Sequence, residues 1–249
     1  MLQDTHIHIQ DIKSSEGMTQ FITACEAAGF GRFFDCAITP ADWPTIRSLA
    51  ENDPLIVPFF GFHPWFADLA DDKSLKNLEE YLAWPRALAG EMGLDRARKN
   101  IDFELQKDVF AQQLVLAEKF KKPFAVHCVR AWGETIKLIR AHAPGLRFLM
   151  HSFNGAKEIA QEISQMGGYF SISVRQFLKP DDQAQIVFQS LPEDRILIET
   201  DFPYQVKWTN PQDYAQAVCQ GYETAAAWKD LPTDQFIQKI FANGTAFTA

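Results

Sequence analysis

Histidines and carboxylates carry the chemistry that this sequence can do. Two of the six histidines open the chain, in residues 2–9, where Asp4, His6 and His8 are spaced two apart. Side chains two apart in a β-strand lie on the same face, so the imidazoles of His6 and His8 are expected to point together. Two neighbouring imidazoles form half of a metal site. Such a pair is common in strands that bind no metal, so the interpretation depends on the other ligands.

The other candidate ligands each follow a separate apolar run. His63 comes after residues 55–60, Glu91 after 87–89, His127 at the end of 124–127, His151 at the end of 147–151, and Asp201 after 196–199. Short apolar runs bounded by turn residues predict strands, so these polar side chains gather where strands end. His142 lies instead near the end of a predicted helix, where a solvated role is expected.

The elements that position these residues alternate along the whole chain. Strands are predicted at 2–9, 32–38, 55–60, 87–89, 124–127, 147–151, 168–174 and 196–199, and helices at 18–28, 41–51, 75–83, 103–120, 134–143, 156–166, 181–189, 211–228 and 233–241. This alternation predicts an α/β protein, a (β/α)8 TIM barrel in a single domain over residues 1–249. A doubly wound open sheet would need a glycine-rich turn after the first strand, where this chain has residues 10–13, QDIK. Barrel active sites lie at the carboxyl ends of the strands, where the candidate ligands fall.

Composition limits the classes of function. The formal net charge of −8 argues against a protein that coats duplex nucleic acid with one basic face. No segment is long and apolar enough to span a membrane and no signal sequence is visible, so we expect a cytoplasmic monomer. The four cysteines are scattered, which favours reduced thiols over disulfides or a thiolate zinc site. Cys128, next to His127, is expected to face away from it and to pack in the core.

Imidazole and carboxylate ligands without thiolates suit divalent ions such as Zn²⁺, Mn²⁺ or Mg²⁺. Four histidines and two carboxylates exceed the ligands of one catalytic zinc ion, so two ions are predicted. One ion is assigned to His6, His8 and Asp201 and the other to His127 and His151, and Glu91 bridges them. Two ions about 4 Å apart activate a water molecule for hydrolysis.

Two residues are given further roles in that reaction. Asp201 is expected to accept a proton from the attacking water. His63, left out of the ligand set, either hydrogen-bonds a substrate oxygen or the leaving group, or only orders its loop. The catalytic residues predicted from the sequence are therefore Asp201, Glu91 and His63.

Taken together, the motifs of this chain resemble those of the TatD family of metal-dependent deoxyribonucleases, in the amidohydrolase-like superfamily. The motifs are D-x-H-x-H at 4–8, GFHP at 61–64, GEMGLD at 90–95, VH at 126–127, HSFNG at 151–155 and ETDFPY at 199–204. The resemblance implies a TIM barrel, two divalent ions held by His6, His8, Glu91, His127, His151 and Asp201, and hydrolysis of DNA phosphodiesters from a 3′ end. The chain departs from the family at three places. It has Val129 where the family usually has arginine, with Arg130 one residue later. The HSFNG motif has Ser152 and Asn154, and the C-terminal segment 241–245 reads FANGT.

The loops at the predicted catalytic end carry cations and aromatic rings. The cations are Arg96, Arg98, Lys99, Arg130, Arg175 and Lys207, and the rings are Trp65, Phe66, Trp132, Phe153, Tyr204 and Trp208. Cations attract phosphate and exposed rings stack on bases, so Arg96, Arg130, Trp132, Phe153 and Tyr204 are predicted to bind single-stranded DNA or DNA ends. The alternative is that the rings cap the barrel and the cations only solvate loops. Lys119, Lys121 and Lys122 precede the fifth strand and are assigned no substrate role.

Three functions remain open at this point. The first is a two-metal phosphodiesterase acting on DNA. The second is a metallohydrolase with the same site that attacks a carbonyl group of an amide, a lactone or an aminoacyl ester. The third is a metal-binding protein whose hydrolytic activity is vestigial. The basic and aromatic loops favour the first function over the second, and the complete ligand set argues against the third.

Overall fold

The computed structural model describes residues 1–205 and 210–249, and its centre is one sheet of eight parallel strands in chain order. The strands are β1 (Leu2–Ile7), β2 (Phe30–Cys36), β3 (Ile56–Phe60), β4 (Leu88–Asp95), β5 (Phe124–Val129), β6 (Phe148–Met150), β7 (Tyr169–Ser173) and β8 (Ile196–Glu199). The two edges meet, because the backbone N–H of Asp201 donates to the carbonyl of His6 and that of His8 donates to Phe202, both at 2.9 Å. The predicted (β/α)8 barrel is confirmed.

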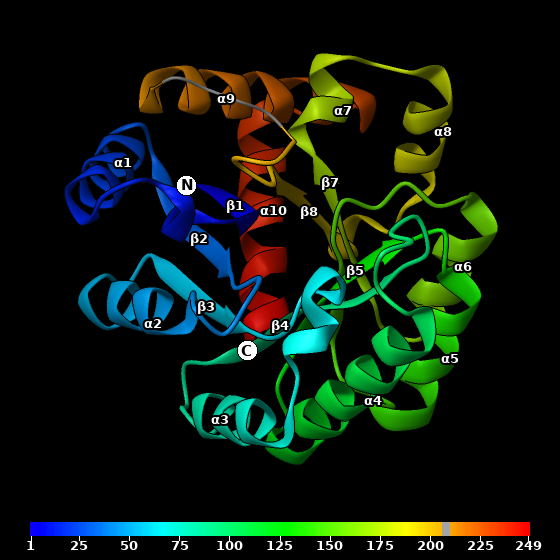
Figure 1. The fold of residues 1–249 in the computed structure, drawn as a ribbon. Helices are drawn as coiled ribbons and strands as arrows, with labels where there is room; N and C mark the ends of the chain where they lie inside the picture. Colours follow the sequence, from blue (N-terminus) through cyan, green and yellow to red (C-terminus); the bar gives the residue numbers. More distant parts are fainter. Residues whose placement is uncertain (206–209) are drawn as a thin grey trace.

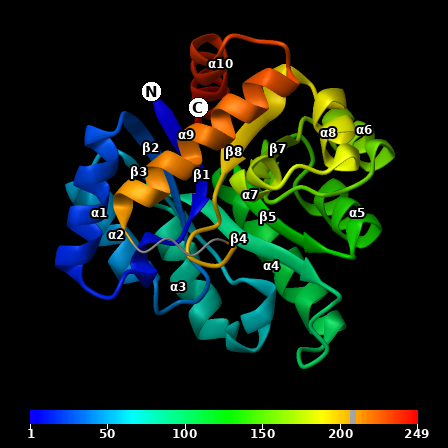
Figure 2. The same ribbon diagram turned by 90° about the horizontal axis from the view of Figure 1, so that it is seen from above.

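Helices surround the strands, as Figure 1 shows. They are α1 (Ser15–Ala27), α2 (Trp43–Asn52), α3 (Asp72–Leu82), α4 (Phe103–Phe120), α5 (Trp132–His142), α6 (Lys157–Gln165), α7 (Val174–Leu178), α8 (Asp182–Ser190), α9 (Pro211–Trp228) and α10 (Thr233–Thr248), with 3-10 turns at η1 (Ile9–Asp11), η2 (Pro64–Leu69) and η3 (Glu193–Arg195). In Figures 1 and 2, α10 lies across one end of the barrel, opposite the carboxyl ends of the strands. No helix in the described part of the chain is long and apolar enough to cross a membrane.

The barrel interior at the α10 end is filled by apolar side chains, which we call the lower layer. Its members come from seven strands and α10: Phe34, Cys36, Phe59, Leu88, Ala125, Leu149, Tyr169, Leu197 and Phe247. The ring of Phe247 closes the base, with its centroid 5.2 Å from that of Tyr169 and 6.0 Å from that of Phe34. Because these side chains fill the interior, the barrel is a packed core and not a channel.

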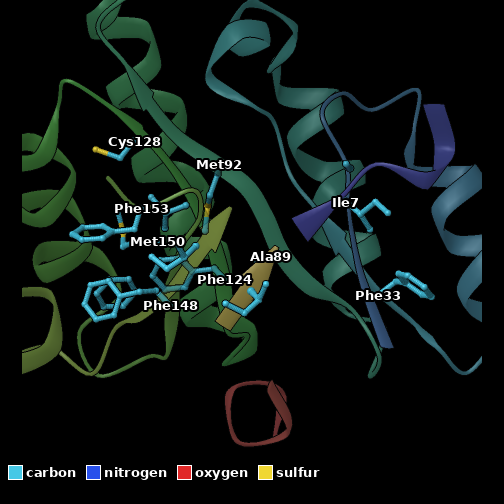
Figure 3. Close-up of a cluster of buried hydrophobic side chains, with 14 of the residues drawn as sticks. Ile7, Phe33, Ala89, Met92, Phe124, Cys128, Phe148, Met150 and Phe153 are labelled. Atoms are coloured by element: carbon cyan, nitrogen blue, oxygen red, sulfur yellow. The ribbon is translucent and has the colours of Figure 1, made fainter. Parts of the chain in front are cut away.

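A larger apolar cluster packs between the strands and the helices. Figure 3 shows part of it, where Phe124, Phe148 and Met150 lie together. The rings of Phe124 and Phe148 are stacked at 5.7 Å. Burial on both faces explains why the strands read as continuous apolar runs and not as alternating ones. Cys128 belongs to this cluster, as expected, and its thiol lies 3.4 Å from the Thr135 hydroxyl.

Strand β4 is longer than the sequence predicted. The predicted strand ended at Ala89, whereas β4 continues to Asp95 and includes Glu91 and two glycines. Glycine normally weakens strands, but here the backbone of Gly93 has φ of +147° and a Cβ atom would lie 2.0 Å from the carbonyl oxygen of His127. Glycine is therefore needed for β4 to approach β5 closely, and Glu91 projects from within the strand.

Other elements also differ from the sequence prediction. The short helix α7 was not predicted; it follows β7 directly, and its N-cap is Ser173, whose hydroxyl accepts the Arg175 N–H. The η2 turn after His63 was also missed. Helix α10 continues to Thr248, beyond the predicted end at residue 241, because Phe247 must reach the lower layer.

Candidate active site

The predicted ligands converge at the carboxyl end of the barrel interior. His6 lies in β1, Glu91 in β4 and His127 in β5, whereas His8, His151 and Asp201 come directly after β1, β6 and β8. All six side chains are buried except Asp201, whose side chain is 13 % exposed. All of them except His6 border a cavity of about 350 Å³, the active-site cavity. It is lined by His8, Asp11, Ile38, Thr39, Asp42, His63, Trp65, Phe66, Glu91, Arg98, His127, His151, Asp201 and Tyr204. We call this polar end of the interior the upper layer.

The Glu91 carboxylate is the centre of the upper layer. One oxygen, Oε2, lies 3.0 Å from His6 Nε2. The other, Oε1, lies 3.0 Å from His127 Nδ1 and 3.1 Å from His151 Nε2. His63 Nε2 is slightly farther, at 3.7 Å from Oε1. A single carboxylate thus faces four imidazoles from four strands, the geometry that a bridging ligand requires.

His8 and Asp201 face each other at the edge of the cavity. His8 Nδ1 lies 2.7 Å from the carbonyl oxygen of Cys36, which can only accept, so this nitrogen carries the proton. In the neutral ring the lone pair is therefore on Nε2, which lies 3.1 Å from Asp201 Oδ1. A lone pair and a carboxylate oxygen at this distance need a proton or a cation between them.

His127 and His151 are held from behind by two carboxylates. His127 Nε2 lies 3.4 Å from Asp95 Oδ2, and His151 Nδ1 lies 3.1 Å from Glu199 Oε1. Each carboxylate accepts the proton of its ring, so the lone pair of the other nitrogen is directed at Glu91. Carboxylates behind imidazoles in this way are typical of metal sites, where they fix the tautomer and raise the basicity of the ligand.

These backing carboxylates were not predicted as part of the site. Both were visible in the sequence, since Asp95 lies in the GEMGLD motif and Glu199 in the ETDFPY motif. Trp65 Nε1 donates to Asp95 Oδ2 at 2.6 Å, and the Ser171 hydroxyl donates to Glu199. Each lies in the same motif as a predicted ligand, Asp95 four residues after Glu91 and Glu199 two residues before Asp201, and this proximity is the signal that could have identified them.

The donor set therefore fits divalent cations. Three imidazole lone pairs, on His8, His127 and His151, point at carboxylate oxygens of Asp201 or Glu91. Nitrogen and oxygen donors with no thiolate suit Zn²⁺, Mn²⁺ or Mg²⁺. In the described part of the chain, the close groups of potential ligand atoms are His6 with His8 and Asp201, His63 with Glu91 and His127, and His6 with His151 and Glu199. The first group has the residues of the first predicted ligand set, and neither of the other two groups has the second predicted set of His127 and His151 with Glu91.

Without a cation, protons take its place. Burial opposes the charged form of His151, yet the charges of Glu91 and Glu199 raise its pKa to about 10. Burial likewise opposes protonation of His8, but its hydrogen bond to Asp201 raises its pKa to about 9. Burial would raise the pKa of Glu91, but the imidazoles of His151 and His6 hold it well below the ordinary value. The upper layer thus binds positive charge strongly, whether as protons or as metal ions.

His63 differs from the other imidazoles. Its Nδ1 accepts the backbone N–H of Trp65 at 3.1 Å, so in the neutral ring Nε2 carries the proton. Burial, the largest influence, lowers its pKa well below the ordinary value and keeps it neutral. This Nε2 lies 3.3 Å from His127 Nδ1 and faces the cavity. His63 is therefore placed as a hydrogen-bond donor in this arrangement, although its ring is close enough to Glu91 and His127 to join a ligand group.

Asp4 does not join the ligands, although it is two residues before His6. Its carboxylate accepts from the Thr200 backbone N–H at 3.0 Å and from the Tyr214 hydroxyl at 2.7 Å. Irregularities in the pairing of β1 with β2 on both sides of Asp4 break the simple alternation of side chains. Asp4 instead ties β1 to the segment after β8, which brings Asp201 opposite His8.

The residues predicted to bind substrate are only partly brought together. Tyr204 is 52 % exposed and lines the active-site cavity. Arg96 turns away, since its guanidinium pairs with Glu134 at 2.5 Å and stacks on Phe103. Arg98 lines the cavity in its place, 3.7 Å from the centroid of the Trp65 ring.

The other predicted contacts lie outside the active-site cavity. Phe153 is 1 % exposed and packs on Trp132 and Phe170, so its ring is not an exposed stacking surface. Trp132 is half-buried and Arg130 is exposed, and neither lines this cavity. Lys207 and Trp208, also expected in the catalytic loops, lie outside the described residues.

A parallel barrel with imidazoles and carboxylates at the carboxyl ends of its strands is the architecture of metal-dependent hydrolases built on the TIM-barrel fold. Within that class the chain belongs to the family described as TatD related DNase, whose model matches residues 3–247. The resemblance inferred from the motifs is thus confirmed.

Individual relatives agree with this assignment. The chain is 29 % identical over 209 residues to an uncharacterized metal-dependent hydrolase, YabD of Bacillus subtilis (strain 168), covering 82 % of this chain and 81 % of that protein. It is 31 % identical over 151 residues to the 3′-5′ ssDNA/RNA exonuclease TatD of Edwardsiella piscicida, covering 58 % and 56 % of the two chains. The crystal structure of YjjV, a TatD homologue from Escherichia coli K12, has the same fold, with a TM-score of 0.89, 23 % identity, and coverage of 99 % of this chain and 97 % of that one.

Proposed function

We propose that this protein is a phosphodiesterase that uses two divalent ions to remove nucleotides from the 3′ end of single-stranded DNA. The observation that carries the proposal is the set of imidazole lone pairs directed at Glu91 and Asp201. The family and the Edwardsiella exonuclease support a nucleic-acid substrate. The barrel over residues 1–249 acts as one domain in this proposal, and the protein works as a monomer.

Six residues would hold the two ions. His6, His8 and Asp201 would hold one ion and His127 and His151 the other, and Glu91 would be shared between them. Of Mg²⁺, Mn²⁺ and Zn²⁺, imidazole-rich sites favour Zn²⁺. When bound, the ions supply charge that lowers the pKa of water and stabilises the phosphate in the transition state.

The protein's own residues perform the proton transfers and position the substrate. Burial acts to raise the pKa of Asp201, but the hydrogen bond from His8 outweighs it, so Asp201 is ionised and can accept a proton. His63 donates a hydrogen bond from its Nε2–H to the leaving oxygen or to a non-bridging oxygen of the phosphate, and the proton stays on the ring. Arg98 attracts the phosphate, and Trp65 and Tyr204 flank the nucleotide inside the cavity.

The test uses the metal-stripped protein and a 20-nucleotide single-stranded DNA labelled at its 5′ end, with Mg²⁺, Mn²⁺ or Zn²⁺ added back. We expect metal-dependent shortening of the strand from its 3′ end. A phosphate group on the terminal 3′ hydroxyl should slow this reaction. The Asp201→Asn variant should lose the activity, whereas Asp213→Asn, a change on the outer helix α9, should keep it. Metal binding without nucleotide release, together with cleavage of an ester or amide panel, would show that the substrate is a carbonyl compound.

A further inference from the structure

A second cavity opens beside the active site, and we call it the distal groove. Its volume is about 820 Å³, and it lies between the loop after β6, helix α7 and helix α8. The lining residues are Ser152, Phe153, Asn154, Gly155, Ala156, Ile172, Arg175, Gln176, Lys179, Asp181, Gln183, Ala184, Val187, Phe188 and Gln205. In Figure 1 these elements occupy one sector of the rim, on the side of α6, α7 and α8.

The distal groove borders the active-site cavity along two chain segments. Ser152 lines the groove and follows His151, and Gln205 lines the groove and follows Tyr204. The side chains of Ser152 and Gln205 are joined by a hydrogen bond of 2.6 Å. A substrate bound at Glu91 and Asp201 therefore needs only to cross this pair to enter the groove.

The charge of the groove suits a polyanion. Arg175 in α7 and Lys179 directly after it are both exposed, and both line the groove. Neither side chain has an ion-pair or hydrogen-bond partner within residues 1–205 and 210–249. Among the described residues that line the groove, the carboxylate is that of Asp181, which accepts the backbone N–H of Gln183 at 2.7 Å and caps α8.

The opposite charge lines another sector of the active-site cavity. Asp11 and Asp42, which come after β1 and β2, contribute carboxylates to that wall. Asp42 is fixed by the backbone N–H groups of Ile38 and Thr39, at 2.9 and 2.7 Å, and Asp11 accepts the Tyr204 hydroxyl at 2.6 Å. A phosphate chain is repelled on this side and attracted on the side of Arg175 and Lys179.

The sizes of the two cavities agree with this asymmetry. A volume of about 350 Å³ is at the small end for ligand pockets and accommodates about one nucleotide. The distal groove is more than twice as large, and the half-buried side chains of Ala184 and Val187 give its wall apolar surface against which bases can lie. A terminal nucleotide therefore fits the first cavity, and the rest of the strand needs a second one.

We infer that the distal groove binds the single strand of DNA upstream of the scissile phosphate, with Arg175 and Lys179 in contact with its backbone phosphates. This inference rests on the proposed function, because it assumes that the reacting phosphodiester belongs to a polynucleotide. Contacts in the groove make the enzyme prefer longer strands to dinucleotides, and they explain how a protein with a negative net charge binds DNA.

The test measures binding of a fluorescein-labelled 12-nucleotide single strand by anisotropy, with EDTA present so that the strand stays intact. The double variant Arg175→Ala/Lys179→Ala is compared with Lys73→Ala/Lys137→Ala, which removes two exposed cations from α3 and α5. We expect about tenfold weaker binding by the first variant at low salt and a smaller effect of salt on its affinity, because about two phosphate contacts are lost. The control variant should bind as the wild type does.

Each outcome separates the groove from the proposed function. Equal binding by the groove variant and the control variant overturns the inference that the groove binds DNA. Binding by the wild type without cleavage after metal is added back overturns the phosphodiesterase and keeps the groove as a strand-binding site. Absence of binding by the wild type overturns the inference that the groove binds DNA, and cleavage after metal is added back then decides the phosphodiesterase separately. A further readout is the ratio of kcat/KM for the 12-mer to that for a dinucleotide, which should fall toward one in the groove variant only.

Discussion

The lower and upper layers of the barrel interior share the same strands but are built from opposite kinds of side chain. The lower layer is apolar and is closed by Phe247 of α10. The upper layer holds imidazoles and carboxylates that contact one another and border a cavity. The lower layer stabilises the fold by removing apolar surface from water. The upper layer buries charge, which is favourable only when each group has a partner.

Cys36 lies at the boundary between the layers. Its side chain belongs to the lower layer, yet its sulfur lies 3.4 Å from His6 Nδ1 and its carbonyl accepts from His8 Nδ1. A single residue of β2 therefore contributes both to the apolar lower layer and to the positions of the imidazoles in the upper layer. Substitutions in each layer should therefore change different measurements.

The largest effect is expected in the upper layer, from Glu91→Gln. Loss of the bridging charge should lower metal-dependent hydrolysis by about 10³-fold, since both predicted ions lose a ligand. Single-turnover cleavage of labelled DNA measures the loss, and near-UV circular dichroism checks that the fold is intact. Glu79→Gln, which changes an exposed carboxylate on α3, is the control. Activity within tenfold of the wild type would contradict the bridging role.

The matching change in the lower layer is Phe59→Ala. Removal of this buried ring, which lies 5.4 Å from that of Phe34, should lower the free energy of unfolding by about 3 to 5 kcal/mol. Urea unfolding measures the loss, and Val115→Ala on the surface of α4 is the control. Below the melting temperature of the variant, metal affinity should remain that of the wild type. If metal affinity falls as much as stability does, the two layers do not act separately.

Asp35 shows what happens to a buried carboxyl that lacks the partners of Glu91. Its Oδ1 accepts the Ile9 N–H at 2.9 Å, but Oδ2 has no hydrogen-bond partner in the described part of the chain. Burial raises its pKa to about 7, in contrast with the lowered pKa of Glu91. The folded chain therefore holds this proton above the ordinary pKa of 3.8, and stability falls as pH rises from about 4 to about 7.

Asp35→Asn should remove this part of the pH dependence. Each tenfold change in the acid dissociation constant corresponds to about 1.4 kcal/mol. Over that pH range the free energy of unfolding should therefore fall by up to about 4 kcal/mol more in the wild type than in the variant. Urea unfolding at pH 4.5, 6 and 8 measures both slopes. Parallel slopes for wild type and variant would show that Asp35 is ionised in the folded chain.

The smallest effect is expected at the boundary, from Cys36→Ala. The thiol orients His6 so that Nε2 faces Glu91, and its loss should weaken metal binding by about 10- to 100-fold. Titration with Zn²⁺ against a competing chelator measures this, and Cys36→Ser should recover part of the affinity because the hydroxyl can still bond the ring. If serine and alanine give the same affinity, the sulfur only fills space.

Much of the fold and site could be predicted from the sequence. The alternation of strands and helices predicted the barrel, and the position of His6, His127 and His151 at strand ends predicted one site. The physical reason is topological: in a parallel barrel all carboxyl ends of strands meet at one rim, so strand-end residues far apart in the chain become neighbours. The lengths of β4 and α10 were wrong because close backbone approach and plugging of the lower layer outweigh local preference.

The sequence by itself determined the residue types of the upper layer and the rim on which they lie. Only the tertiary structure decided which partner each side chain faces. It placed Asp95 and Glu199 behind His127 and His151, turned Arg96 toward Glu134 while Arg98 lines the cavity, and buried Phe153. Side-chain direction depends on strand register, bulges and the packing of neighbouring helices, which join residues distant in the chain and leave no mark in local spacing.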